Sequence, residues 1–229
     1  MHFATVRDNL ARVREEIGRI QAIEGLSNDV RVVGVTKGHP VEAIRTAARA
    51  GLEDVGENRV QEFVAKRDQV THPCRWHLIG HLQRNKVRHA IGKFELIHSV
   101  DSLRLAAEID HRAGAAGLRQ EILVQVNLAQ EATKFGVAEA DLPQMLDGLA
   151  EMPNLGIVGL MTIPPPAGRP EDSRRWFARM RELNEAQAAR LGVALTELSM
   201  GMTDDFEIAV EEGATLVRVG RAIFGERGA

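Results

Sequence analysis

Lys37 is the residue whose position best suits covalent chemistry. It directly follows Val33-Gly34-Val35-Thr36, the end of an apolar run. A lysine at such an end is partly desolvated, and desolvation lowers the pKa of its amine and makes it nucleophilic toward an aldehyde. A lysine whose stem covers apolar surface while its amine reaches solvent is equally compatible with the position.

Two glycine-containing segments follow later apolar runs and have the composition of anion-binding loops. They are Ser199-Met200-Gly201-Met202-Thr203 and Val219-Gly220-Arg221-Ala222. Small residues allow backbone N–H groups to approach an anion closely. Ordinary turns that need glycine would explain either segment alone. The two together favour a phosphate held by loop amides.

Arg218 lies within the otherwise apolar run Leu216–Val219. A guanidinium in such a run is costly unless it meets an acceptor, and a pyridine nitrogen would serve. A salt bridge to Glu57 or Glu197 is an equal alternative. A lysine able to form an imine, two phosphate loops and an arginine together describe a site for pyridoxal 5'-phosphate.

The elements that must position these residues are short strands alternating with amphipathic helices. A helix containing Val6–Ile20 comes first, and a further helix is expected at Leu82–Ile91. Eight strands are predicted, at Val30–Thr36, Glu53–Gly56, Trp76–Ile79, Glu95–Val100, Gln120–Asn127, Leu155–Thr162, Ala194–Ser199 and Thr215–Val219. This pattern predicts an α/β fold, a (β/α)8 TIM barrel formed by residues 1–229 as one domain, although a doubly wound sheet remains open. In a barrel, reactive groups gather at the C-terminal ends of the strands.

Composition argues against several classes of partner. The 229 residues carry a formal net charge of -3, which gives no electrostatic reason to expect nucleic acid. The basic cluster Arg84, Lys86, Arg88 and His89 is interpreted as a solvated helix face. A single cysteine, Cys74, and the lack of a signal-like N-terminus favour the cytoplasm, and no apolar run is long enough for a membrane span. No metal site is expected.

Seven motifs spread over nearly the whole chain are highly specific in order and spacing. They are Gly34–Lys37, Val55–Asn58, Trp76–Lys86, Val124–Asn127, Gly159–Thr162, Leu198–Asp205 and Val217–Gly225. These motifs resemble those of the pyridoxal phosphate homeostasis proteins, the YggS/PROSC family. The resemblance implies a barrel similar to the N-terminal domain of alanine racemase and a role in vitamin B6 balance with no established catalytic reaction.

The resemblance also implies a role for each matching residue. Lys37 would be the Schiff-base lysine, Arg218 the partner of the pyridine nitrogen, and Asn58 a neighbour of the ring. The phosphate would lie among Ser199, Met200, Gly201, Gly220 and Arg221. The chain departs from the commonest family forms at Gly38-His39 and at Arg221, which leaves open the side chains that complete the phosphate shell.

The leading functional hypothesis is a protein that holds and releases pyridoxal phosphate without turning over a substrate, with PLP-dependent apoenzymes as potential recipients. The alternative is a PLP-dependent amino-acid racemase. Racemases of this architecture resemble two-domain proteins that contribute a tyrosine as a second base, whereas this chain has no tyrosine. A cofactor-free Schiff-base aldolase is a third hypothesis. Lys134 is a weaker hypothesis for a second lysine at the mouth, and an exposed loop lysine is favoured over it.

Overall fold

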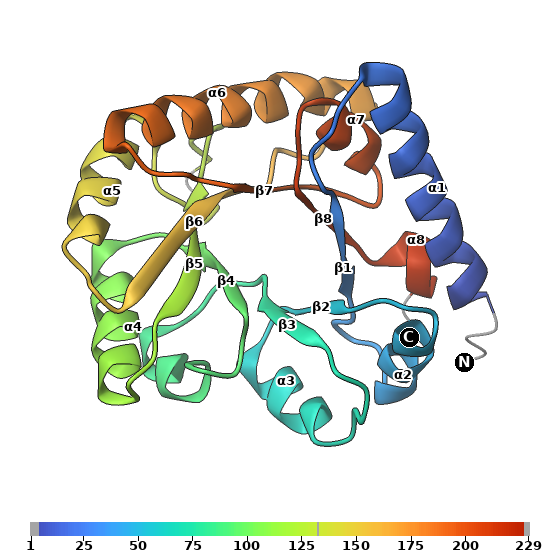
Figure 1. Cartoon of the computed structure of the whole chain (residues 1–229), viewed down its shortest axis with the longest axis horizontal. Coiled ribbons are helices and arrows are strands. Elements are labelled where there is room, and N and C mark those ends of the chain that lie inside the picture. The colour runs from blue at the N-terminus through green and yellow to red at the C-terminus, as the bar shows by residue number, and fades with distance from the viewer. Residues whose placement is uncertain (1–4, 132, 227–229) are drawn as a thin grey trace.

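Eight parallel strands close into a barrel in chain order, and β8 completes the ring by pairing with β1 (Figure 1). The structure is a computed structural model that describes residues 5–131 and 133–226. The strands are β1 (Arg31–Val35), β2 (Asp54–Glu57), β3 (Arg75–Leu78), β4 (Leu96–Val100), β5 (Gln120–Val126), β6 (Leu155–Thr162), β7 (Glu197–Met202) and β8 (Leu216–Val219). The predicted barrel is confirmed, and the doubly wound alternative is wrong.

Helices surround the barrel on its outer side (Figure 1). They are α1 (Val6–Glu24), α2 (Val41–Arg49), α3 (Val60–Arg67), α4 (Leu103–Ala115), α5 (Leu142–Ala150), α6 (Arg174–Leu191), α7 (Phe206–Glu211) and α8 (Arg221–Phe224), with 3-10 helices η1 (Arg84–His89), η2 (Glu139–Asp141) and η3 (Pro170–Ser173). The helix expected at Leu82–Ile91 is therefore wrong in kind, because the chain forms only the short η1 there. Within η1 only Val87 is buried, so this segment has no apolar stripe that could support a longer helix.

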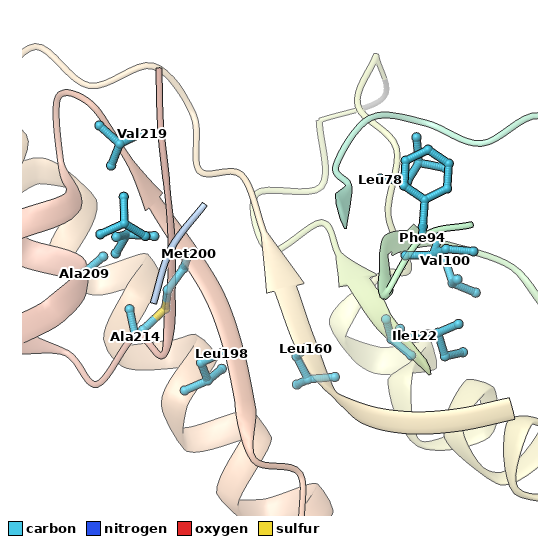
Figure 2. Packing of buried hydrophobic residues seen from close by; sticks show 14 of the residues in the cluster. Leu78, Phe94, Val100, Ile122, Leu160, Leu198, Met200, Ala209, Ala214 and Val219 are labelled. Carbon is cyan, nitrogen blue, oxygen red and sulfur yellow. The ribbon is translucent and has the colours of Figure 1, made fainter. Parts of the chain in front are cut away.

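Two separate apolar clusters stabilise the fold. The larger one lies between strands and helices, and it includes the buried face of α1. Met200, Ala209 and Ala214 also belong to it (Figure 2). The smaller one includes Val33, Leu123 and Leu216, whose strands alternate inward and outward faces. Its members are at most 8% exposed, so the barrel interior is packed and leaves room for a ligand only at an end.

Strand β7 lies later in the sequence than predicted. It was expected to end at Ser199, but it continues to Met202, and its pairing with β8 shifts register between Ser199 and Met202. Gly201 has φ of +86° at this irregularity, and an added Cβ would lie 2.5 Å from Cβ of Ala209. Only glycine fits both constraints. Ser199, Met200 and Gly201 therefore belong to the strand and not to the loop that follows it.

The described residues do not contain two features that would indicate other functions. No helix in residues 5–131 and 133–226 has the length and apolar character needed to cross a membrane. Within the same ranges, no group of three or more histidine, cysteine or carboxylate side chains is arranged to hold a metal ion.

Candidate functional site

A cavity of about 610 Å³ lies at the C-terminal ends of the strands, where barrels carry their reactive groups. Its volume is within the range of roughly 300–1,000 Å³ typical of small-molecule sites. Five of the predicted site residues line it: Lys37, Asn58, Arg218, Gly220 and Arg221. They come from the ends of β1, β2 and β8, so the fold brings together residues far apart in sequence.

The loop that carries Lys37 is held from the side by α3. The Lys66 amine donates to the backbone oxygen of Thr36 (2.8 Å) and to Glu57 Oε1 (2.7 Å). The Thr36 hydroxyl donates to the same carboxylate oxygen at 2.6 Å. Burial raises the pKa of Glu57, and the hydrogen bonds from Lys66 and Thr36 oppose that rise. This buried ion pair fixes the backbone on the N-terminal side of the half-buried Lys37.

Arg218 contributes a buried positive charge to the cavity wall. Its side chain donates to Ser199 Oγ (2.6 Å) and to the backbone oxygen of Thr162 (2.9 Å), and both acceptors are neutral. In the part of the chain that the structure describes, no carboxylate lies within ion-pair distance of it. Burial lowers the pKa of Arg218 to about 10. A ligand atom that accepts a hydrogen bond would therefore meet a strong donor.

The carboxylates suggested as partners for Arg218 have other partners. Glu57 forms the pair with Lys66, and Glu197 lies 2.8 Å from Arg31. The salt-bridge alternative raised by the sequence is therefore wrong for Glu57 and Glu197. The charge of Arg218 instead faces the cavity.

Backbone donors from the loop after β8 converge on one point in the cavity wall. The N–H groups of Gly220 and Ala222 point to the Thr203 hydroxyl, at 3.3 and 3.4 Å. Thr203 itself lines the cavity and follows β7. These long contacts show two amides aimed at a single polar atom, an arrangement that also suits an anion. The Arg221 side chain forms ion pairs with Asp204 and Glu226, which also line the cavity.

Three residues predicted for the phosphate cradle do not line this cavity. The Ser199 hydroxyl is buried in the barrel interior beside Arg218, Met200 packs in the outer core, and Gly201 lies against α7. The difference follows from the extension of β7, which moves the loop to Met202-Thr203-Asp204. The sequence predicted Thr203 as the cap of the following helix, but α7 begins at Phe206 and its N-cap is Asp205.

The opposite wall contains residues that sequence reasoning did not connect. His81 stacks on Phe135 with ring centroids 3.7 Å apart and an interplanar angle of 10°. Gln125 donates to the backbone oxygen of Phe135 at 3.0 Å. These residues come together because of the long loop after β5. Hydrophobic periodicity in the sequence does not predict the path of such a loop.

Close backbone packing shapes the same wall. Gly80 lines the cavity, and a Cβ added to it would lie 2.3 Å from the backbone oxygen of Asn58. Asn58 and the segment after β3 can approach this closely only because residue 80 is glycine.

Lys134 lies beside a neighbouring cavity and not in the wall around Lys37. Its amine is 2.7 Å from Glu131 Oε1 and donates to the backbone oxygen of Pro164 at 3.2 Å. The two cavities share Ile163, Met202 and Asp204. The second-lysine hypothesis stays a prediction.

Comparison with known sequences gives full-length matches. Residues 7–228 match the family model described as alanine racemase, N-terminal domain. The chain is 44% identical to the pyridoxal phosphate homeostasis protein of Aquifex aeolicus, over 96% of this chain and 97% of that protein. It is 34% identical to the protein of the same name from Escherichia coli K12, over 97% of each chain.

Solved structures also match this chain over nearly its whole length. The structure of PipY from Synechococcus elongatus with PLP bound has a TM-score of 0.86 and 38% identity, and the match covers 96% of this chain and 100% of that chain. Alanine racemase from Clostridium difficile has a TM-score of 0.77 at 17% identity, with 97% of this chain and 60% of that chain covered, which shows the shared fold alone.

The Glu57–Lys66 pair generates a pH-dependent prediction. In Lys66→Met the fully buried Glu57 carboxylate loses its cation, so its pKa rises further above the ordinary value of 4.5. A carboxyl group with a raised folded-state pKa favours folding below its unfolded pKa, and that contribution is lost as the pH rises through the folded value. The free energy of unfolding of Lys66→Met, measured by urea titration, should therefore fall further below wild type at about pH 8 than at about pH 5.

The expected loss at the higher pH is about 3–5 kcal/mol, the usual cost of removing one partner of a buried pair. Adding Glu57→Gln to Lys66→Met should remove this pH dependence, because position 57 then has no carboxyl group to titrate. A loss independent of pH in the single variant would show that removing Lys66 does not change the folded-state pKa of Glu57.

Proposed function

This chain belongs to the family of pyridoxal phosphate homeostasis proteins, and from that premise we propose that its cavity holds and releases pyridoxal phosphate through Lys37, without turning over a substrate. When bound, the cofactor supplies an aldehyde that condenses reversibly with a lysine amine. The observation that carries the proposal is that Lys37 and Arg218, whose described hydrogen-bond acceptors are both neutral, line the same cavity.

The donor set of the cavity fits this cofactor. Arg218 would donate to the ring nitrogen, because a buried guanidinium supplies strong donors and its described acceptors are neutral. The amides that converge on Thr203, from Gly220 and Ala222, would hold the phosphate end together with the backbone at Arg221. Asn58 would lie near the ring.

Residues beyond the cavity wall would act indirectly. Ser199 would support Arg218 from the barrel interior, and Met200 and Gly201 would position the loop after β7. We propose that the whole chain, residues 1–229, acts as one cofactor-binding domain in the cytoplasm. Neither nucleic acid nor a membrane is part of the proposal.

PLP-dependent apoenzymes are the proposed recipients of the released cofactor. Exposed apolar side chains at the cavity, Phe135 (53% exposed), Met202 (38%) and Ile163 (37%), support contact with a second macromolecule at this end of the barrel. The half-buried position of Lys37 supports exchange of the aldehyde with an incoming amine.

Lys37→Ala should abolish both the visible absorption of cofactor-loaded protein and the adduct fixed by borohydride. Mass spectrometry of the reduced wild-type protein should find the modified peptide at Lys37. The matched control is Lys134→Ala, which removes a lysine from the neighbouring cavity and should retain the adduct. A main reduced adduct on any lysine other than Lys37 would disprove the assignment.

Alanine should not be racemised. Inversion needs acid/base groups on both faces of the cofactor, and each positioned group contributes roughly 10²–10⁴-fold in rate. The chain has no tyrosine, and the His81 imidazole at the cavity is stacked on Phe135 with Nδ1 at 3.4 Å from Asp101.

In heavy water we expect at most slow exchange of the α-proton of one alanine enantiomer, followed by NMR, with no accumulation of the other enantiomer on a chiral column. Rapid interconversion that disappears in Lys37→Ala would establish the racemase alternative instead.

A further inference from the structure

A continuous chain of buried hydrogen bonds runs from Arg218 through the barrel interior. Arg218 Nη1 lies 2.6 Å from Ser199 Oγ, which lies 2.8 Å from His98 Nδ1. His98 Nε2 lies 2.9 Å from His77 Nδ1, and His77 Nε2 lies 2.8 Å from Asp54 Oδ1. The five residues are contributed by five strands and are each at most 4% exposed. We call this chain of five residues the interior relay.

The direction of the interior relay is set by its two ends. A guanidinium can only donate and an ionised carboxylate can only accept. With both imidazoles neutral, one proton is available for each bond. Ser199 then donates its hydroxyl proton to His98 Nδ1, while His98 and His77 each donate from Nε2. Every bond points from Arg218 toward Asp54.

The charge states required for this arrangement agree with the surroundings. Burial, together with the nearby charge of Arg218, lowers the pKa of His98 well below its ordinary value, so its ring is neutral. Burial would raise the pKa of Asp54, but hydrogen bonds from Arg75 and His77 overcome it and lower that pKa. Asp54 is therefore ionised and can end the relay as an acceptor.

We infer that His98 and Ser199 are positioning residues for Arg218. The interior relay holds the guanidinium where it binds the ring nitrogen of the cofactor, and this inference rests on the proposed function. Consecutive bonds of one direction polarise each other, so the oxygen that Ser199 presents to Arg218 becomes a stronger acceptor when Ser199 donates its own proton to His98. Without that acceptor, Arg218 would keep only the Thr162 backbone oxygen among its described hydrogen bonds.

Two matched substitutions at His98 separate the two halves of the relay. An asparagine amide reaches about as far as Nδ1 and a glutamine amide about as far as Nε2. His98→Asn thus keeps an acceptor for Ser199 and loses His77, whereas His98→Gln keeps a donor to His77 and loses Ser199. Each variant loses one bond, but only His98→Gln removes the acceptor of the Ser199 hydroxyl proton.

The readout is the dissociation constant of pyridoxal 5'-phosphate, measured beside that of 1-deazapyridoxal 5'-phosphate, in which carbon replaces the ring nitrogen. His98→Gln should weaken binding of the natural cofactor roughly tenfold, and His98→Asn should stay within about twofold of wild type. Both variants should bind the deaza compound within about twofold of wild type, because it offers Arg218 no acceptor. Equal losses of affinity for both ligands, or equal losses of affinity in both variants, would show that the relay has only a structural role.

A second measurement reads the relay in wild-type protein without cofactor. Nitrogen-15 NMR of labelled histidines should find His98 and His77 both as Nε2–H tautomers near neutral pH. A proton on His98 Nδ1 would overturn the inference even if the His98 variants fail to fold. If the wild-type protein does not bind the cofactor, the proposed function is overturned. The histidine tautomers of the relay can still be measured in that case, so the two failures are distinguishable.

Discussion

The buried positive charge of Arg218 is the constraint on which the site depends. Moving a charged group out of water costs several kcal/mol unless partners compensate, and here the nearest hydrogen-bond acceptors are a hydroxyl and a backbone oxygen. The neighbouring strands do not supply a direct counter-ion, because Glu197 pairs with Arg31 and Glu57 with Lys66. A hydrogen-bond acceptor on a molecule bound in the cavity would therefore compensate the charge of Arg218.

Charge inside the barrel is arranged in two layers separated by an apolar one. The first residues of β1, β2, β3 and β7 form ion pairs at the N-terminal end, namely Arg31, Asp54, Arg75 and Glu197. The cluster containing Val33, Leu123 and Leu216 fills the middle. Lys37 and Arg218 lie at the C-terminal end. The interior relay is the polar connection between the two charged layers.

Much of this architecture was predictable from sequence, because parallel strands and amphipathic helices have different hydrophobic periods. The barrel, α1, the place of Lys37 at a strand end and that of Arg218 within the last strand were predicted from such patterns. The end of β7 was not, since a register shift with a left-handed Gly201 breaks the alternation on which the prediction relied. The histidines of the relay were not predicted either. A single buried histidine in a strand has no distinctive sequence pattern. His77 and His98 come into contact only when the barrel closes, so their hydrogen bond could not be predicted from sequence.

The most direct test of the central claim is the protonation state of the ring nitrogen. A neutral pyridine accepts from Arg218, whereas a protonated ring would place two cations together in a buried site. Nitrogen-15 NMR of ring-labelled pyridoxal 5'-phosphate bound to the protein distinguishes the two. We predict the chemical shift of an unprotonated, hydrogen-bonded pyridine nitrogen that changes in Arg218→Met. The shift of a protonated pyridinium in the wild-type protein would contradict the account.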